Sequence, residues 1–520
     1  MKLSTCVLLG ALLGSLLAAQ PAAKKIYPKR WVYVGTGLAT DNDLVKIREI
    51  IETAAAHGLN GIVLSAGLDQ IDRQPPAYLE RLKQMKQIAD RFGVEIIPSG
   101  FGTGYGGALL AHDKNLAEGL PVKGALYVVG SGAGSGQAVF QAETEPVVIA
   151  SSGPAPVARF EKLLDVKPHR CYRVKVKVRG EGVAPGATLE FRADTLDKKR
   201  NWCWFERPIV SGREWHEYTT AFNSAASDKL NFNIAIEDGL AGKLELEDLR
   251  IEEVGLVNVV RREGTPLQVR GEKSGTVYKE GRDYAPVADP NLNFQFDHAS
   301  PAITLSAGTR IKKGERLRVD YYHGMTIYKD QTPACMSEPK TLEIWSKQFP
   351  LIQKYLAPKT YLLSLDEERM GGTCEACRRR HMTMAAMMGD SATRLFDMAR
   401  AASPGAEVFI WSDMFDPNHN AVANYYLVDG DYTGSWKYLP KDIQIACWNY
   451  DTREKSLPFF SGLGYKTLAA AYYDADDLTN PQGWLDSLDK TPGAVGIMYT
   501  TWENKYKLLP GFGDMVSKRK

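Results

Sequence analysis

The chain lacks an excess of charge of either sign. Its 520 residues include 64 lysines and arginines against 62 aspartates and glutamates, which gives a formal net charge of +2. Proteins that bind nucleic acids usually present clustered basic charge to the phosphates, so this balance gives no electrostatic case for a nucleic-acid partner. A neutral ligand, or one recognised by a local site, fits the composition better.

Long hydrophobic runs are lacking beyond the first residues. Residues 1–23 have a positively charged start, a short apolar core and small residues at its end. This pattern predicts a secretory signal peptide that is cleaved around Ala19 to Ala23. No later segment approaches the roughly 20 apolar residues that a membrane helix needs. We therefore expect a secreted or periplasmic protein that does not insert into the membrane after cleavage.

Cysteine is scarce, with seven residues in the chain, and its spacing offers only half of a zinc site. Cys374 and Cys377 have the Cys-x-x-Cys spacing of zinc ligands, but the sequence has no second such pair and no histidine pair at ligand spacing. Export makes disulfides possible, so a loop disulfide or free thiols is the favoured interpretation. The sequence thus predicts no metal site and no cofactor.

Two kinds of pattern divide the remaining chain. Strand-like and helix-like runs alternate from residue 31 to about 106 and again after residue 340, which indicates parallel strands with crossover helices. Between about 124 and 315 the apolar residues recur with a period of two, which is typical of an antiparallel sandwich with one face in water. The run from Leu317 to Tyr322 is interpreted as the last strand of this insertion.

Three predicted strands precede the insertion and five follow it, and eight is the number that closes a (β/α)8 barrel. The predicted fold is therefore α/β, a (β/α)8 TIM barrel interrupted after strand 3 by an antiparallel β-sandwich. The predicted segments are a signal peptide (1–23), the first part of the barrel (24–123), the inserted sandwich with a small β segment (124–318), and the second part of the barrel with most of the active site (319–520).

Two adjacent carboxylates, Asp366 and Glu367, follow the predicted strand from Tyr361 to Leu365. The carboxyl ends of barrel strands are where this fold places its chemistry. Burial and the neighbouring negative charge would raise the pKa of one carboxyl, which suits a proton donor to a glycosidic oxygen. In the alternative interpretation Asp366 caps a turn, and the glutamates lie in water or pair with Arg369.

Aromatic side chains also stand beside carboxylates or amides at the ends of the four later strands. Sugars need this mixture, because their apolar faces stack on aromatic rings while their hydroxyls bind carboxylates and amides. The pattern predicts carbohydrate binding more strongly than catalysis. The residues are Trp411 and Asp413, Trp448 and Asn449, Tyr472, Tyr473 and Asp474, and Trp502 and Glu503, with His112 and His323 as further candidates at the pocket mouth.

These strand ends resemble the barrel of family 20 glycoside hydrolases, the β-N-acetylhexosaminidases, over about residues 27–106 and 340–510. The sequence has Leu363-Ser364-Leu365 before the pair, where that family has His-x-Gly-Gly. The inserted sandwich resembles family 4 and 9 carbohydrate-binding modules in its strand pattern.

The resemblance implies that Glu367 is the general acid and then the base, while Asp366 orients a substrate acetamido group that attacks the anomeric carbon. It also implies that Tyr473 or Tyr472 binds the acetamido oxygen. Without an acetamido group, Asp413 or Glu503 becomes the candidate nucleophile. The resemblance assigns Trp411, Trp448 and Trp502 to the sugar ring, and Asp474 and Glu503 to its hydroxyls.

The predicted function is therefore an exported glycoside hydrolase that acts on an oligo- or polysaccharide, with glycans containing N-acetylhexosamine as candidates. The alternative is a non-catalytic carbohydrate-binding protein on the same scaffold.

Overall fold

The computed structural model describes residues 25–519, with short gaps at 131–135, 154–155, 197–200, 210–211, 213, 237–240, 295–297 and 330. The predicted signal peptide lies outside the described residues. Within the described part of the chain, no helix is both long enough and apolar enough to cross a bilayer.

Eight parallel strands close into a barrel in the order in which they occur along the chain. They are β1 (Lys29–Val34), β2 (Gly61–Leu64), β3 (Glu95–Gly100), β18 (Thr360–Leu363), β20 (Glu407–Trp411), β22 (Gln444–Cys447), β23 (Thr467–Tyr472) and β24 (Ala494–Thr500). Strand β1 pairs with both β2 and β24, which completes the ring. The predicted barrel is thereby confirmed, with three strands before the insertion and five after it.

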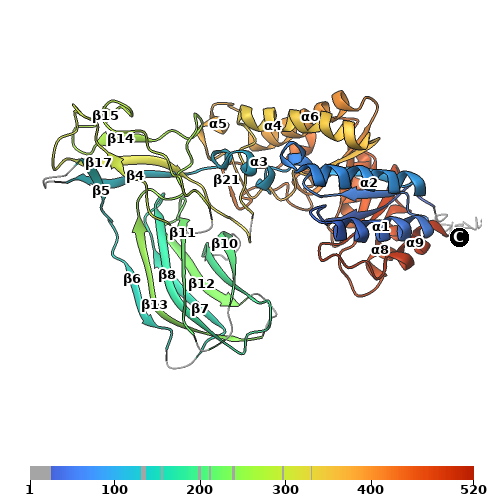
Figure 1. Ribbon diagram of the computed structural model, residues 1–520, viewed down its shortest axis with the longest axis horizontal. Coiled ribbons are helices and arrows are strands. Elements are labelled where there is room, and N and C mark those ends of the chain that lie inside the picture. Colours follow the sequence, from blue (N-terminus) through green and yellow to red (C-terminus); the bar gives the residue numbers. More distant parts are fainter. Residues whose placement is uncertain are drawn as a thin grey trace, which may run out of the picture.

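Helices cover the outside of the barrel (Figure 1). The longer ones are α1 (Asp41–Ala56), α2 (Pro76–Phe92), α4 (Pro339–Leu356), α6 (Met384–Ala402), α7 (Arg453–Gly462), α8 (Thr479–Leu488) and α9 (Leu509–Ser517). Helix α1 begins at a capping box in which Thr40 and Asp43 satisfy each other's backbone N–H groups. Helix α2 ends at Gly93, whose left-handed conformation suits glycine. Short helical turns are η1 (Leu68–Arg73), α3 (Gly107–His112), η2 (Lys114–Leu116), α5 (Glu375–Arg378), η3 (Asp413–Phe415) and η4 (Ser435–Tyr438).

Strands β4 to β17 stand between β3 and β18 in the chain, and eight of them form a β-sandwich. One antiparallel sheet has the order β10-β9-β12-β7 and the other β11-β8-β13-β6, and their apolar side chains share one core. The bounds are β6 (Val147–Ser151), β7 (Arg159–Asp165), β8 (Cys171–Glu181), β9 (Thr188–Asp194), β10 (Asn201–Pro208), β11 (His216–Asn223), β12 (Lys229–Ile236) and β13 (Lys243–Val254). The predicted sandwich is confirmed.

A six-stranded antiparallel sheet with the order β15-β14-β17-β4-β5-β16 forms the rest of the insertion. Its strands are β4 (Leu120–Val129), β5 (Gln137–Phe140), β14 (Gln268–Gly271), β15 (Val277–Tyr278), β16 (Ile303–Thr304) and β17 (Arg316–His323). The run from Leu317 to Tyr322 therefore belongs to β17, which pairs with β4 and not with a barrel strand. The predicted segment boundaries at 123/124 and 318/319 fall within β4 and β17, and they stay predictions.

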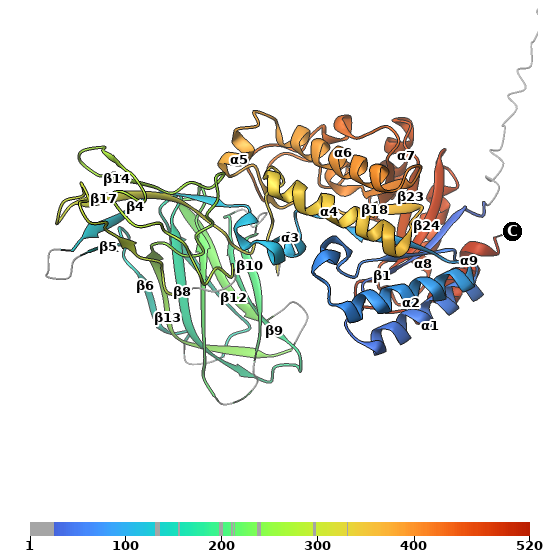
Figure 2. The ribbon, with the colours of Figure 1, turned by 45° about the horizontal axis from the view of Figure 1, so that its top comes forward.

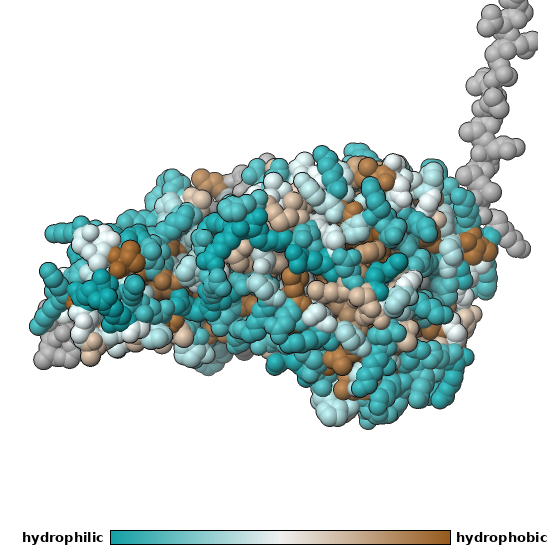
Figure 3. Space-filling view, turned by 90° about the horizontal axis from the view of Figure 1, so that it is seen from above, coloured by the Kyte–Doolittle hydropathy of each residue, from teal (hydrophilic) through white to brown (hydrophobic). Residues whose placement is uncertain are grey.

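The insertion lies to one side of the barrel (Figures 1 and 2). The small strands β19 (Met370–Gly371) and β21 (Leu427–Val428) pair with each other, and Met370 and Leu427 belong to the apolar core of the sandwich. This contact joins the sandwich to the loops that follow β18 and β20. Seen from above, the surface is mainly hydrophilic and its hydrophobic residues are scattered (Figure 3).

Candidate active site

A cavity of about 620 Å³ lies at the carboxyl ends of the barrel strands. Each of the eight strands contributes a residue at its end or just beyond it. In strand order these are Tyr33, Ser65, Gly100, Ser364 with Asp366 and Glu367, Trp411, Trp448, Tyr473 and Trp502. The site is therefore assembled by the barrel as a whole, at the position where this fold carries its chemistry.

Asp366 lines this cavity and is half-buried. Burial raises the pKa of Asp366 well above its usual range, and the negative charges of Asp413 and Glu367 raise it further. The flanking Leu365 and Glu367 both have positive φ angles, of 67° and 50°, a conformation that costs energy for residues with side chains. The backbone thus holds a carboxyl of raised pKa in the cavity at the cost of local strain.

Glu367 lines the same cavity in a different environment. Its carboxylate lies 2.6 Å from Nη2 of Arg369 and also accepts a hydrogen bond from the hydroxyl of Tyr105. The Arg369 side chain is only 5% exposed, and its guanidinium lies 4.0 Å from the ring centroid of Tyr328. The predicted pairing of a glutamate with Arg369 therefore occurs, inside the cavity wall and not in bulk water. A buried guanidinium at this distance makes a charge-assisted contact with the Glu367 side chain and fixes its orientation.

Glu368 points away from the cavity and supports the glycine-rich loop after β3. Its Oε1 accepts hydrogen bonds from the backbone N–H groups of Thr103 and Gly104 and from the Thr103 hydroxyl. Burial raises the pKa of Glu368 to about 7, and these hydrogen bonds limit the rise. The loop it holds carries Tyr105, the hydrogen-bond partner of Glu367.

Five of the aromatic side chains that line the cavity come from the strand ends, and we call them the aromatic wall: Tyr33, Trp411, Trp448, Tyr473 and Trp502. The rings of Trp448 and Tyr473 are parallel to within 2°, with centroids 6.0 Å apart. Trp502 lies 4.9 Å from Tyr33 and 6.4 Å from Trp411 between ring centroids. Trp502 and Tyr473 remain 48% and 39% exposed, so they present ring surface to a ligand.

Asp413 and Asp474 position the strand ends and do not line the cavity. Oδ2 of Asp413 accepts hydrogen bonds from the Glu367 backbone N–H at 2.8 Å and from Asn420, and Oδ1 accepts one from Trp448 Nε1 at 3.3 Å. Burial raises the pKa of Asp413 to about 6. Asp474 accepts hydrogen bonds from the Thr501 hydroxyl and from the backbone N–H of Trp502.

The structure places the other predicted residues outside the lining of the cavity. Tyr472 is buried and stacks on Tyr499, with centroids 4.0 Å apart, so of the two adjacent tyrosines only Tyr473 reaches the cavity. The Asn449 side chain accepts a hydrogen bond from the backbone N–H of Asp451, and Glu503 pairs with Lys505 at the surface. His112 lies on α3 against Asp72, and His323 is buried in β17.

Sequence reasoning missed several lining residues that come from distant segments. Tyr105 comes from the glycine-rich loop, Tyr328 and Lys329 from the chain returning from the insertion, and Asp69 from η1. The one local signal for Tyr105 was the run of glycines around it. At Gly104 a Cβ atom would lie 2.9 Å from the carbonyl oxygen of Asp366, so the loop packs directly on the backbone of Asp366 and Glu367.

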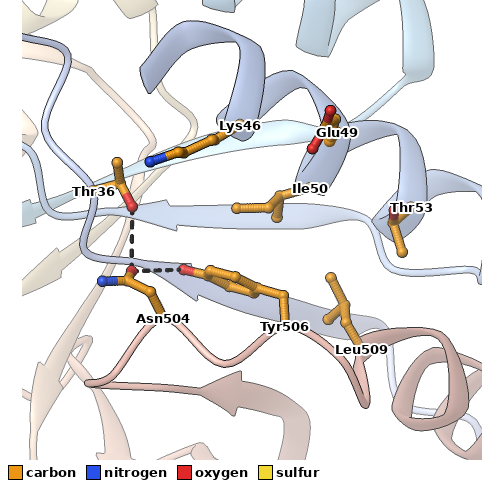
Figure 4. A pocket seen from close by; sticks show the side chains of 8 residues that line it. All are labelled: Thr36, Lys46, Glu49, Ile50, Thr53, Asn504, Tyr506 and Leu509. Carbon is orange, nitrogen blue, oxygen red and sulfur yellow. Dashed lines mark hydrogen bonds between the residues drawn. The ribbon is translucent and has the colours of Figure 1, made fainter. Parts of the chain in front are cut away.

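A second cavity of about 530 Å³ lies between α1 and the segment that precedes α9 (Figure 4). There Thr36 and Tyr506 donate hydrogen bonds to the Asn504 side-chain oxygen. Its charged lining residues are one lysine and one glutamate, Lys46 and Glu49. It has no pair of adjacent carboxyls and no cluster of rings, so the cavity at the strand ends is the better candidate for chemistry.

No protein-family model matches the sequence, and no curated protein matches it significantly. Solved structures do match. A β-N-acetylhexosaminidase from Bacteroides fragilis is 10% identical with a TM-score of 0.40, over 95% of this chain and 65% of that one. A chitobiase from Flavobacterium johnsoniae is 10% identical with a TM-score of 0.39, over 95% of this chain and 48% of that one.

The chain thus spans about half to two thirds of the length of these two proteins. The segment-level matches include a carbohydrate-binding module of a Cellvibrio mixtus lichenase, 14% identical with a TM-score of 0.16, over 26% of this chain. TM-scores below 0.5 do not establish a shared fold, so the barrel described above rests on its own strand order.

Proposed function

We propose that this protein is a glycoside hydrolase that cleaves an oligo- or polysaccharide at the carboxyl end of its barrel. One observation carries the proposal: two adjacent carboxyls in unlike environments, Asp366 and Glu367, lie within a cavity lined by the aromatic wall. Its volume of about 620 Å³ falls within the 300–1,000 Å³ typical of small-ligand sites. Exposed ring faces at Tyr473 and Trp502 provide stacking surfaces for a sugar.

Glycosidic cleavage commonly uses one protonated carboxyl and one carboxylate. Asp366 is the proposed acid, because burial raises its pKa well above the usual range, and Glu367, which pairs with Arg369, is the proposed second carboxyl. This division differs from the one that the family resemblance implies, in which Glu367 is the acid. The two residues are therefore tested separately.

The proposed substrates are glycans containing N-acetylhexosamine, and the proposed site of action is outside the cytoplasm. The substrate proposal rests on the order of the aromatic and acidic residues at the strand ends and on Tyr473, which lines the cavity while Tyr472 does not. The location proposal rests on the pattern of a signal peptide in residues 1–23.

The second candidate is a carbohydrate-binding protein without turnover. The observation that favours it is the ion pair between Glu367 and Arg369, which engages one oxygen of the carboxylate, while Tyr105 engages the other. A carboxylate held in this way can accept hydrogen bonds from sugar hydroxyls without transferring a proton.

The deciding experiment measures turnover of a panel of aryl glycosides by the wild type, Asp366→Asn and Glu367→Gln. We expect each substitution to lower kcat about 10²- to 10⁴-fold, the usual contribution of general acid–base catalysis. Glu80→Gln, on the exposed face of α2, is the matched control and should retain wild-type turnover. Saccharide binding by a wild type that turns over none of the panel would support the second candidate instead.

The pH profile identifies the acid. An acid must be protonated to act, so activity falls as pH rises through its pKa, and the variant lacking the acid loses this alkaline limb. That variant also retains more activity on glycosides with strongly acidic leaving groups, which depart without protonation. We expect Asp366→Asn to show both effects, and their appearance in Glu367→Gln would restore the assignment implied by the resemblance.

A further inference from the structure

A buried cluster of three thiols and one carboxyl lies outside the cavity. Glu118 precedes β4 and Cys335 precedes α4. Cys374 is the N-cap residue of α5, and Cys377 lies within α5. Their ligand atoms all lie within 4.8 Å of one another, and all four residues are buried. Neither the cavity nor the proposed reaction uses them.

The separations of these atoms fit the edges of a tetrahedron around a metal ion. The sulfur–sulfur distances are 3.4 Å from Cys335 to Cys374, 3.6 Å from Cys335 to Cys377 and 3.8 Å from Cys374 to Cys377. Zinc bound at about 2.3 Å to each of three sulfurs separates them by about 3.8 Å. Glu118 Oε2 lies 3.6 Å from the Cys374 sulfur and 3.9 Å from the Cys377 sulfur, against about 3.5 Å in the same geometry.

The two oxygens of Glu118 have different surroundings. Oε1 accepts hydrogen bonds from the backbone N–H of Thr373 at 2.9 Å, from the Thr373 hydroxyl at 2.7 Å and from the backbone N–H of Cys374 at 3.0 Å. These donors fix the carboxylate so that Oε2 faces the sulfurs. Donors of this kind behind a ligand oxygen are the usual support of a metal site.

A buried cation, Arg262, lies beside the cluster, where it pairs with Glu338 and offsets part of the charge that such a site would carry. Three thiolates and a carboxylate around a divalent ion leave a net charge of about −2. The side chain of Arg262 is 9% exposed, and its Nη2 lies 3.5 Å from the Cys374 sulfur. It also donates hydrogen bonds to the backbone carbonyls of Asn115 and Ala117, next to Glu118.

A disulfide explains the cluster less well. The shortest sulfur–sulfur distance, 3.4 Å, exceeds the roughly 2.05 Å of a disulfide bond, and the three cysteines are free thiols in the structure. A neutral disulfide between two of the cysteines would leave a third thiol and a buried carboxylate without a function. A metal uses all four groups.

We propose that Cys335, Cys374, Cys377 and Glu118 bind a structural zinc ion. Four protein ligands complete the tetrahedron, and a closed site of this kind stabilises folded structure and leaves no position for a substrate. The site links three segments of the chain. Glu118 lies where the chain enters the insertion, Cys335 lies where it leaves the insertion, and Cys374 and Cys377 lie in the loop after Arg369. Zinc therefore fixes the insertion and this loop to each other.

The test begins with the metal content of the full chain, purified without chelators or a metal-affinity tag. We expect about one zinc per chain, with Cys335, Cys374 and Cys377 present as thiols once the protein is unfolded and the metal removed. Cys377→Ser should lose the zinc. Glu118→Gln should weaken zinc retention in a competition with a chromogenic chelator. Cys447→Ser, a buried cysteine of β22 outside the cluster, is the matched control and should retain one zinc.

Two further measurements keep the test decisive if a variant fails to fold. Cobalt substituted into the wild type should give the intense visible bands of a tetrahedral thiolate site. Removal of zinc should lower the melting temperature, and added zinc, but not magnesium, should restore it. The proposal would be overturned if the wild-type protein held less than about a tenth of an equivalent of zinc, or held iron instead. A protein mass lower by two hydrogens, which indicates a disulfide between two of the cysteines, would also overturn it.

Discussion

A buried histidine outside the cavity makes the folded protein sensitive to mild acid. His323 is fully buried in β17, and its Nδ1 donates a hydrogen bond to the carbonyl oxygen of Val257 at 2.8 Å. Burial lowers the pKa of His323 to about 4. In the unfolded chain the pKa is about 6.5, so the unfolded state binds more protons between these two values.

Stability linked to His323 is therefore complete above pH 6.5 and is lost as pH falls towards 4. Between pH 7 and pH 5 the loss in the free energy of unfolding is about 2 kcal/mol. His323→Gln keeps a donor for Val257 but does not titrate, so its urea midpoint should change less between these two pH values. Equal acid sensitivity of wild type and variant would assign the effect to other groups.

The glycine-rich loop between β3 and α3 depends on a close approach of two backbones. A Cβ atom at Gly104 would lie 2.9 Å from the carbonyl oxygen of Asp366 and 3.1 Å from that of Glu367. Gly104→Ala must move the loop, and with it Tyr105, away from Asp366 and Glu367. We expect a destabilisation of about 1–3 kcal/mol and at least a tenfold loss of kcat on the best aryl glycoside.

Gly107→Ala is the matched control, because nothing lies within 4 Å of its added methyl group. Thermal unfolding and steady-state kinetics of both variants check the prediction. An active Gly104→Ala enzyme would show that the position of Tyr105 does not matter for turnover.

The barrel strands and helices were predictable because their signals are local. The predicted strand from Tyr361 to Leu365 matches β18 to within two residues at each end, since buried parallel strands appear in a sequence as short apolar runs between helices. The count of eight then gave the barrel. The same logic placed Asp366, Glu367, Trp411, Trp448, Tyr473 and Trp502 at one end, because the carboxyl ends of parallel strands meet there.

The contacts between distant segments were not predictable. Glu118 and Cys374 are 256 positions apart, and only the return of the insertion brings Cys335 to them. In the sequence, the Cys-x-x-Cys pair therefore indicated only two of the four ligands of a zinc site. Tyr472 and Tyr473 were equivalent in the sequence, and three successive positive φ angles, from Tyr472 to Asp474, decide which ring reaches the cavity.

The insertion also contributes to the cavity of the barrel. Tyr328 and Lys329, on the returning chain, line the cavity, and Tyr328 lies against the guanidinium that pairs with Glu367. Directly after this guanidinium, Met370 enters the apolar core of the sandwich together with Leu427. The sandwich therefore supports the loop that holds Arg369.

Met370→Ala tests this coupling between the sandwich and the barrel. Met370 is 1% exposed, and its truncation leaves a cavity that costs about 2–5 kcal/mol. Leu246→Ala is the matched control. It makes a comparable cavity within the sandwich, because Leu246 lies near the amino-terminal end of β13 and is 2% exposed. We expect both variants to unfold at lower temperature, but only Met370→Ala to lose turnover below the melting transition, because only it loosens Arg369 beside Glu367. Equal turnover by the two variants would mean that the sandwich is a separate module, and that the barrel alone determines the geometry of the site.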